Sequence, residues 1–298
     1  MTGLGNLIRR NCRLFFRDKG MFFSSLITPI ILLVLYVTFL GNVYRDSFTG
    51  ALPEGFVIED ALLNATVGGQ LISSLLAVCC VTVAFCSNLL MVQDRVSGAR
   101  RDLAVSPVRP STIAVAYFCA SAMVTLIINF AALALCLLYL VKTGWYLVFA
   151  DVLEIALDVF LLTLFGVALS SCVNFPLRTQ GQGSAVGTIV SAGYGFLCGA
   201  YMPISNFSSG LQKVLSFLPG TYGTSLLRNH ALAGAYREMA RVGFPAEVIE
   251  AIRDSIDCNL YFFGRSVSIG GMYAVLVGAT LLLVGLYVLL NAVRRERT

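Results

Sequence analysis

Charged residues are scarce in this 298-residue chain: they make up 12% of it, whereas hydrophobic residues make up 57%. Ordinary soluble domains carry roughly 25% charged residues. Half that value, together with repeated apolar runs close to 20 residues long, is typical of an all-α protein that crosses a membrane several times. A transmembrane β-barrel is excluded, because its strands alternate in polarity and run only about 10 residues.

Residues that build metal or catalytic centres are also few. The chain has a single histidine, His230, which we interpret as structural. Its nine cysteines are odd in number and show no ligand spacing, so the sequence predicts neither a disulfide framework nor a metal site. Without a Ser/His, Cys/His or His-cluster arrangement, no enzyme activity is expected of the chain itself. The modest net charge of +5 gives no indication of nucleic-acid binding.

Long apolar runs are abundant, and they predict six transmembrane helices within a single domain that covers residues 1–298. The predicted spans cover residues 21–40, 66–92, 113–141, 152–173, 184–202 and 267–293. An even number of spans places both termini on one side. The short segments on that side carry thirteen Lys and Arg residues against two in the short loops opposite. The positive-inside rule therefore predicts cytoplasmic termini in a multi-pass protein of the plasma membrane.

The N-terminal segment, residues 1–19, is predicted to form an amphipathic helix that lies in the membrane interface. Its apolar face carries Leu4, Leu7, Ile8, Leu14 and Phe15. Its opposite face carries arginines at helical spacing, with one more beside them: Arg9, Arg13, Arg17 and Arg10. Such a helix binds membrane lipid through apolar burial and through arginine contacts to phosphates.

The polar segment 94–110, DRVSGARRDLAVSPVRP, separates the second and third spans. A short helix is predicted over residues 96–105, because Pro107 and Pro110 end it and redirect the chain. In this interpretation the segment presents positive and negative side chains to a soluble partner. They are Asp94, Arg95, Arg100, Arg101 and Asp102. Leu103 and Val96 add a small apolar contact surface for that partner. The alternative interpretation is a solvated basic loop that merely follows the positive-inside rule.

The same segment resembles the cytoplasmic signature of ABC-2-type permeases, the transmembrane subunits of ABC exporters with the type V fold. The matching residues are Asp94, Arg95, Gly98, Leu103, Ser106 and Pro107. Asp94 stands where Glu is usual, and Ala99 stands where Thr is usual. Residues 199–228 resemble the exit of the family's fifth span, with a Pro after the span and another after a short amphipathic helix.

This resemblance implies a permease that works as a dimer, expected to be a homodimer, with two copies of a separate ABC ATPase subunit. ATP and Mg²⁺ are then bound by the partner, and this chain, which lacks a GxxxxGK[ST] loop, needs no cofactor. The expected function is export of an amphipathic small molecule, drug or peptide by alternating access, with 94–110 as the coupling helix. The alternatives are export of a lipid-linked or polysaccharide substrate, or ion-coupled secondary transport through Asp158.

Residues 203–265 form a long outer segment. The sequence predicts two short helices that re-enter the outer leaflet, at residues 211–218 and 222–232, and then an external helical patch at residues 236–257. On the opposite side, the turn at 174–183 is predicted as a second ATPase contact around Arg178.

Candidate pathway residues lie in two places. Asp151, Glu154 and Asp158 share one helix face, either as an outer rim that partners a loop arginine or as a proton-linked site. The resemblance adds four wall residues near the fifth span: Tyr194, Phe196, Tyr201 and Met202.

Overall fold

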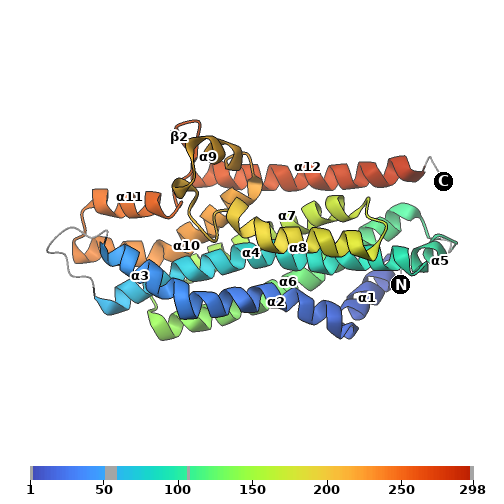
Figure 1. Ribbon diagram of the computed structural model, residues 1–298, viewed down its shortest axis with the longest axis horizontal. Helices are drawn as coiled ribbons and strands as arrows, with labels where there is room; N and C mark the ends of the chain where they lie inside the picture. The colour runs from blue at the N-terminus through green and yellow to red at the C-terminus, as the bar shows by residue number, and fades with distance from the viewer. Residues whose placement is uncertain (1–2, 51–58, 106–107, 296–298) are drawn as a thin grey trace.

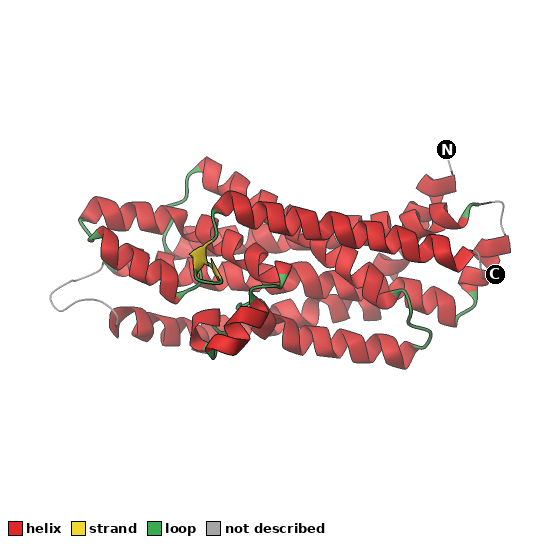
Figure 2. Cartoon of the chain, turned by 90° about the horizontal axis from the view of Figure 1, so that it is seen from above, coloured by secondary structure: helices red, strands yellow, loops and turns green. Residues whose placement is uncertain are grey.

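The structure, a computed structural model, describes residues 3–50, 59–105 and 108–295. Nearly all of it is helical, and the long helices run side by side along the longest axis of the molecule (Figures 1 and 2). The described strands are only β1, Tyr261–Phe262, and β2, Arg265–Ser266, which pair antiparallel. The predicted all-α class is therefore correct.

The N-terminal helices meet at a sharp bend of 73°. Helix α1, Gly3–Arg17, ends there, and α2, Lys19–Leu35, begins after Asp18. The Asp18 carboxylate accepts a hydrogen bond from the backbone N–H of Met21 at 3.1 Å, a standard way to start a helix. Helix α2 continues through Pro29 into a π-helical turn, η1, Tyr36–Leu40, and then α3, Gly41–Gly50.

Helix α4, Asp60–Val96, is the centre of the bundle and packs against α2, α6, α7, α8 and α10. In its most apolar 18-residue window, 89% of the residues are buried. Leu76, Val78 and Val81 are completely inaccessible. A helix that is apolar on all sides is expected in this central place.

The helices around α4 are α6, Pro110–Thr143, α7, Phe149–Asn174, α8, Gln180–Leu197, and α12, Ile269–Arg295. Among the described helices, α4, α6, α7 and α12 are long and apolar enough to cross a membrane, and α1 with α2 makes a fifth if the bent pair counts as one span. The predicted fifth span folds as α8, which is shorter than expected and rich in Gly, Ser and Gln. A multi-pass membrane protein is therefore clear, whereas the count of six is not.

The outer segment differs from the prediction of two short helices. It contains η2, Ile204–Asn206, α9, Ser209–Leu215, α10, Pro219–Val242, and α11, Ala246–Ser255. The stretch predicted as a short helix at 222–232 is the buried first half of the 24-residue α10. The helix continues until Gly243, whose φ of 97° lies in the left-handed region that terminates helices.

Both termini and the short helix α5, Ala99–Val105, lie at one end of the molecule, while α3 and α11 lie at the other (Figure 1). This arrangement brings the N-terminal helix and the 94–110 segment together, although they are far apart in the sequence.

Candidate functional site

The connection between α4 and α6 is built around Gly98. Helix α4 ends at Val96, and Gly98 has a φ of 85°, which a residue with a side chain adopts only at a cost. The carbonyl of Gly98 accepts the backbone N–H of Arg101 at 2.8 Å, which starts the seven-residue α5. The predicted short helix is therefore present over residues 99–105, but it begins three residues later than predicted, because Gly98 separates it from the end of α4. Ser106 and Pro107 of the signature lie outside the described residues.

Asp94, four residues earlier, is held inside the protein. Its carboxylate accepts two hydrogen bonds from the Arg10 guanidinium of α1, at 2.7 and 3.1 Å. The hydroxyl of Tyr117 in α6 donates a third at 2.5 Å. Asp94 is only 6% exposed. These contacts fix the end of α4 to both α1 and α6.

Arg95 attaches the same end of α4 to the turn that follows α7. Its guanidinium donates hydrogen bonds to the backbone carbonyls of Phe175, at 2.7 Å, and of Leu177. It also lies 5.8 Å from the centre of the Phe175 ring, within cation–π range. The turn between α7 and α8, which contains the exposed Arg178, is therefore attached to the end of α4.

These contacts correct the prediction for the charged segment. Asp94 and Arg95 do not present their charges to a soluble partner, because both make contacts within the chain. The surface left for a partner is α5 itself, where Arg101 and Asp102 are exposed and Val105 is 88% exposed. Arg100 and Leu103 are half-buried beneath this surface.

The N-terminal helix packs on protein along one side. Leu7, Asn11 and Phe15 are buried, and α1 makes its main contacts with α6. The predicted arginine face is present: Arg9, Arg13 and Arg17 are exposed, whereas Arg10 turns inward to Asp94. Leu14, which was predicted on the apolar face that binds lipid, is 37% exposed, whereas Leu7 and Phe15 of the same face are buried against protein.

The acidic residues of α7 all find partners on other helices. Asp151 forms a two-pronged ion pair with Arg237 of α10, at 2.9 and 2.5 Å, which matches the predicted role as partner of a loop arginine. Asp158, with no exposed surface, lies 2.6 Å from His230 Nδ1 and accepts the hydroxyl of Tyr273 in α12 at 2.7 Å. Glu154 lies 3.5 Å from the other ring nitrogen of His230.

The sequence reasoning did not pair His230 with Asp158. Seventy-two residues separate the two in the chain, and no local pattern connects them. The available signal was chemical: an acid inside an apolar span needs a partner, and the chain has only one histidine.

Comparison with known proteins agrees with the signature. The family model described as "ABC-2 type transporter" matches residues 2–231, which is most of the chain and includes α1, α5 and the α8 region. The chain belongs to the ABC-2 type transporter family. No curated protein sequence matches it. ABC-2 permeases are membrane components of transporters and normally work with an ATPase subunit.

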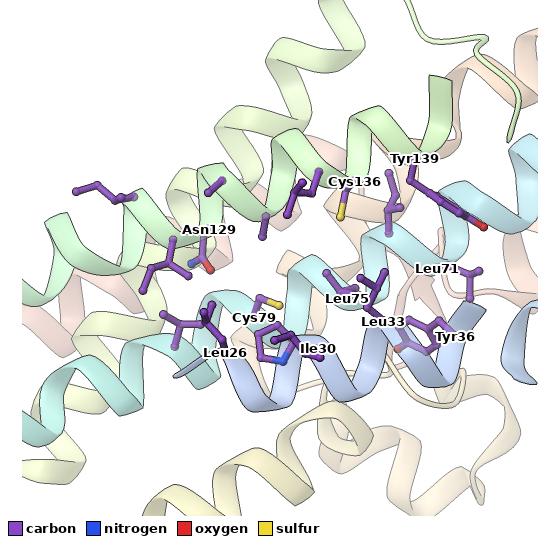
Figure 3. A pocket seen from close by; sticks show the side chains of 18 of the residues that line it. Leu26, Ile30, Leu33, Tyr36, Leu71, Leu75, Cys79, Asn129, Cys136 and Tyr139 are labelled. Atoms are coloured by element: carbon purple, nitrogen blue, oxygen red, sulfur yellow. The ribbon is translucent and has the colours of Figure 1, made fainter. Parts of the chain in front are cut away.

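The four residues predicted on the wall of a pathway lie together around the end of α8 in this ABC-2 permease. Tyr194 is buried, and Phe196 is 51% exposed with its ring centre 5.0 Å from that of Tyr201. The hydroxyl of Tyr201 donates to the carbonyl of Ser191 at 3.3 Å, and Met202 is half-buried. None of the four lines the cavity that α2, α4 and α6 form on another side of α4 (Figure 3).

Proposed function

We propose that this chain is the transmembrane permease of an ATP-driven exporter. It pairs with a second permease chain, as a homodimer, and with two ABC ATPase subunits that bind ATP and Mg²⁺. The observation that carries the proposal is the geometry of α5: an exposed, charged helix whose base is fastened to α1, α6 and the α7–α8 turn through Asp94 and Arg95.

Movement of α5 is transmitted directly to the centre of the bundle. Only Ser97 and Gly98 separate it from α4, which packs against five other long helices. Because Arg10 and Arg95 fasten the same end of α4, a displacement there also carries α1 and the start of α8. This is the linkage that alternating access needs, since closure of an ATPase dimer must tilt several helices together.

The proposed orientation places the α5 end in the cytoplasm. Both chain termini lie at that end (Figure 1), and the exposed arginines of α1 surround it. This agrees with the excess of basic residues in the short segments of that side. The membrane is proposed to be the plasma membrane.

For the substrate we favour an amphipathic small molecule, drug or peptide over a polysaccharide or lipid-linked sugar. Sugar-binding paths use rows of aromatic side chains, and the only tryptophan, Trp145, lies in the connection between α6 and α7. Ion-coupled transport through Asp158 has weaker support, because His230 and Tyr273 occupy both of its carboxylate oxygens.

The test is a double substitution on the exposed side of α5, Arg101→Ala with Asp102→Ala. Neither side chain takes part in the anchoring of Asp94 and Arg95, so the variant is expected to insert and to unfold at the wild-type temperature. We expect at least a tenfold loss of ATPase subunit recovered with the permease, and a matching loss of ATP-dependent efflux.

The matched control removes two exposed charges away from α5, Lys213→Ala in α9 with Glu247→Ala in α11. It should leave ATPase recovery and efflux unchanged. Wild-type ATPase recovery and efflux in the α5 variant would refute the proposal.

A further inference from the structure

A cavity on the side of α4 that faces α2 and α6 was not used in the function proposed above. It has a volume of about 830 Å³ and lies between α2, α4 and α6, with the end of α1 closing one side (Figure 3). Pockets of roughly 300–1,000 Å³ hold drug-sized ligands. The size therefore suits a small amphipathic molecule or one hydrocarbon chain.

The walls of the cavity define what can enter. Its floor is formed by buried apolar residues of α4, among them Leu75 and Cys79. Its mouth is formed by Ile30 of α2, 54% exposed, and Leu135 of α6, 66% exposed. Because the mouth opens between two apolar helices on the outside of the bundle, a ligand enters sideways from the hydrocarbon of the bilayer. Water is not expected to fill this cavity, since it finds few hydrogen-bond partners in an apolar lining.

Polar groups interrupt this lining at three positions, Tyr36, Tyr139 and Asn129. Asn129 of α6 has no exposed surface, and its amide nitrogen donates to the hydroxyl of Thr163 in α7 at 2.8 Å. Its oxygen, Oδ1, has no hydrogen-bond partner among the described residues. Figure 3 shows the side chain directed away from α6, toward the side of the cavity where Cys79 lies. A buried acceptor without a partner is unfavourable, and a donor from a ligand would satisfy it.

We propose that this cavity binds a hydrophobic molecule that carries one hydrogen-bond donor, a hydroxyl or an amide N–H. The hydrocarbon part lies among the leucine and isoleucine side chains, and the donor reaches Asn129 Oδ1. A membrane lipid with a free hydroxyl and an amphipathic transported molecule share this chemistry. The site is independent of the exporter proposal, because binding requires neither ATP nor an ATPase subunit.

The experiment uses the purified chain in phosphatidylcholine nanodiscs and two photoreactive probes, a diazirine-labelled hexadecanol and its methyl ether. The two differ only in the donor hydroxyl. We expect the alcohol to label peptides of α2, α4 and α6 about five- to tenfold more than the ether, the effect of one hydrogen bond. Unlabelled hexadecanol should compete with the alcohol probe.

Two variants separate the hydrogen bond from the cavity. Asn129→Leu should lower labelling by the alcohol to the level of the ether and leave the ether unchanged. Ala132→Phe, which fills the cavity from the same helix, should suppress labelling by both probes at least tenfold. The control is Leu138→Phe, an exposed position of α6 outside the cavity, where wild-type labelling is expected.

Equal labelling of the wild type by alcohol and ether, or full labelling of Ala132→Phe, would overturn the proposal without needing a folded Asn129 variant. A bifunctional cross-linker that joins the Ile30 or Leu135 peptides to a second copy of the chain would make the cavity a subunit interface instead and overturn the proposal. Lipids that co-purify with the wild type but not with Asn129→Leu identify a membrane lipid as the occupant. If no such lipid co-purifies, loss of ATP-dependent efflux in Ala132→Phe identifies a transported molecule as the occupant.

Discussion

Arg10 and Asp94 are 84 residues apart in the chain, and they form a two-pronged ion pair where α1 crosses the end of α4. Asp94 is the acidic residue at the start of the segment that resembles the family signature, while Arg10 belongs to a helix whose other arginines, Arg9, Arg13 and Arg17, are exposed. The pair attaches the N-terminal helix to the segment that we propose as the coupling site. The Tyr117 hydroxyl adds α6 to the same carboxylate.

Loss of this pair should destabilise the protein and weaken coupling together. Arg10→Met is expected to lower the free energy of unfolding by about 2 kcal/mol, the contribution of a charged hydrogen bond that is partly exposed. Asp94→Asn should cost a similar amount, and the double variant should cost less than the sum of both. Thermal unfolding in nanodiscs measures this double-mutant cycle.

The matched control is Arg9→Met, since Arg9 is exposed on the neighbouring position of α1. It should leave the unfolding temperature unchanged. Additive effects of Arg10→Met and Asp94→Asn would mean that the pair contributes no coupling energy.

Gly98 is expected to be needed for its backbone alone. Nothing lies within 4 Å of a side-chain carbon placed there, but its φ of 85° strains any other residue. Gly98→Ala should therefore cost roughly 1–2 kcal/mol, and Gly98→Asn should cost less because Asn tolerates this conformation. Chemical unfolding and ATPase co-purification provide the readouts.

Gly187→Ala in α8 is the control, because it also meets nothing within 4 Å and has ordinary helical geometry. It should be neutral or slightly stabilising. If Gly98→Ala and Gly187→Ala have the same unfolding free energy and the same ATPase co-purification, the left-handed conformation is not the reason for a glycine at position 98.

Arg228 fastens the outer half of the bundle. It is 1% exposed and donates to the carbonyls of Ile256, at 2.6 Å, and Gly199, with Asp257 3.5 Å away. Arg228→Met is expected to destabilise the protein by about 3–5 kcal/mol, because it leaves a buried carboxylate without its cation. Arg241→Met, on the exposed end of α10, should leave the unfolding temperature unchanged.

The same variant should gain a pH dependence. Burial raises the pKa of Asp257, and the charge of Arg228 opposes that rise. Without Arg228 the pKa rises further, so the folded state binds a proton more tightly than the unfolded chain does. Stability is then lost as the pH increases through the pKa of the folded state and recovered on acidification. A wild-type pH profile of unfolding in Arg228→Met would contradict this account.

Asp158 and His230 are expected to hold helices together rather than to couple ion flow. Asp158→Asn and His230→Gln should each cost about 1–3 kcal/mol, because each leaves a buried polar group without its partner. ATP-dependent efflux should persist in whichever variants fold. Efflux that loses its dependence on a proton gradient in Asp158→Asn would instead favour the ion-coupled alternative.

Some features of this protein were determined by its sequence alone. The membrane class follows from apolar runs long enough to cross a bilayer. The resemblance to the family follows from the signature in residues 94–110 and from the order of the apolar runs around it. The arginine face of α1 follows from helical periodicity. All of these depend on residues close together in the chain.

The tertiary structure decided which charges face outward. Asp94 and Arg95 were predicted to meet a partner, but contacts with Arg10 and with the carbonyl of Phe175 turn them inward. His230 pairs with Asp158, which lies on a helix distant in the sequence. Helix α10 is also longer than the short helix predicted at 222–232. Such pairings depend on how the helices pack. A buried charge pairs with a group that the fold brings close to it, and the local sequence does not show which group that is.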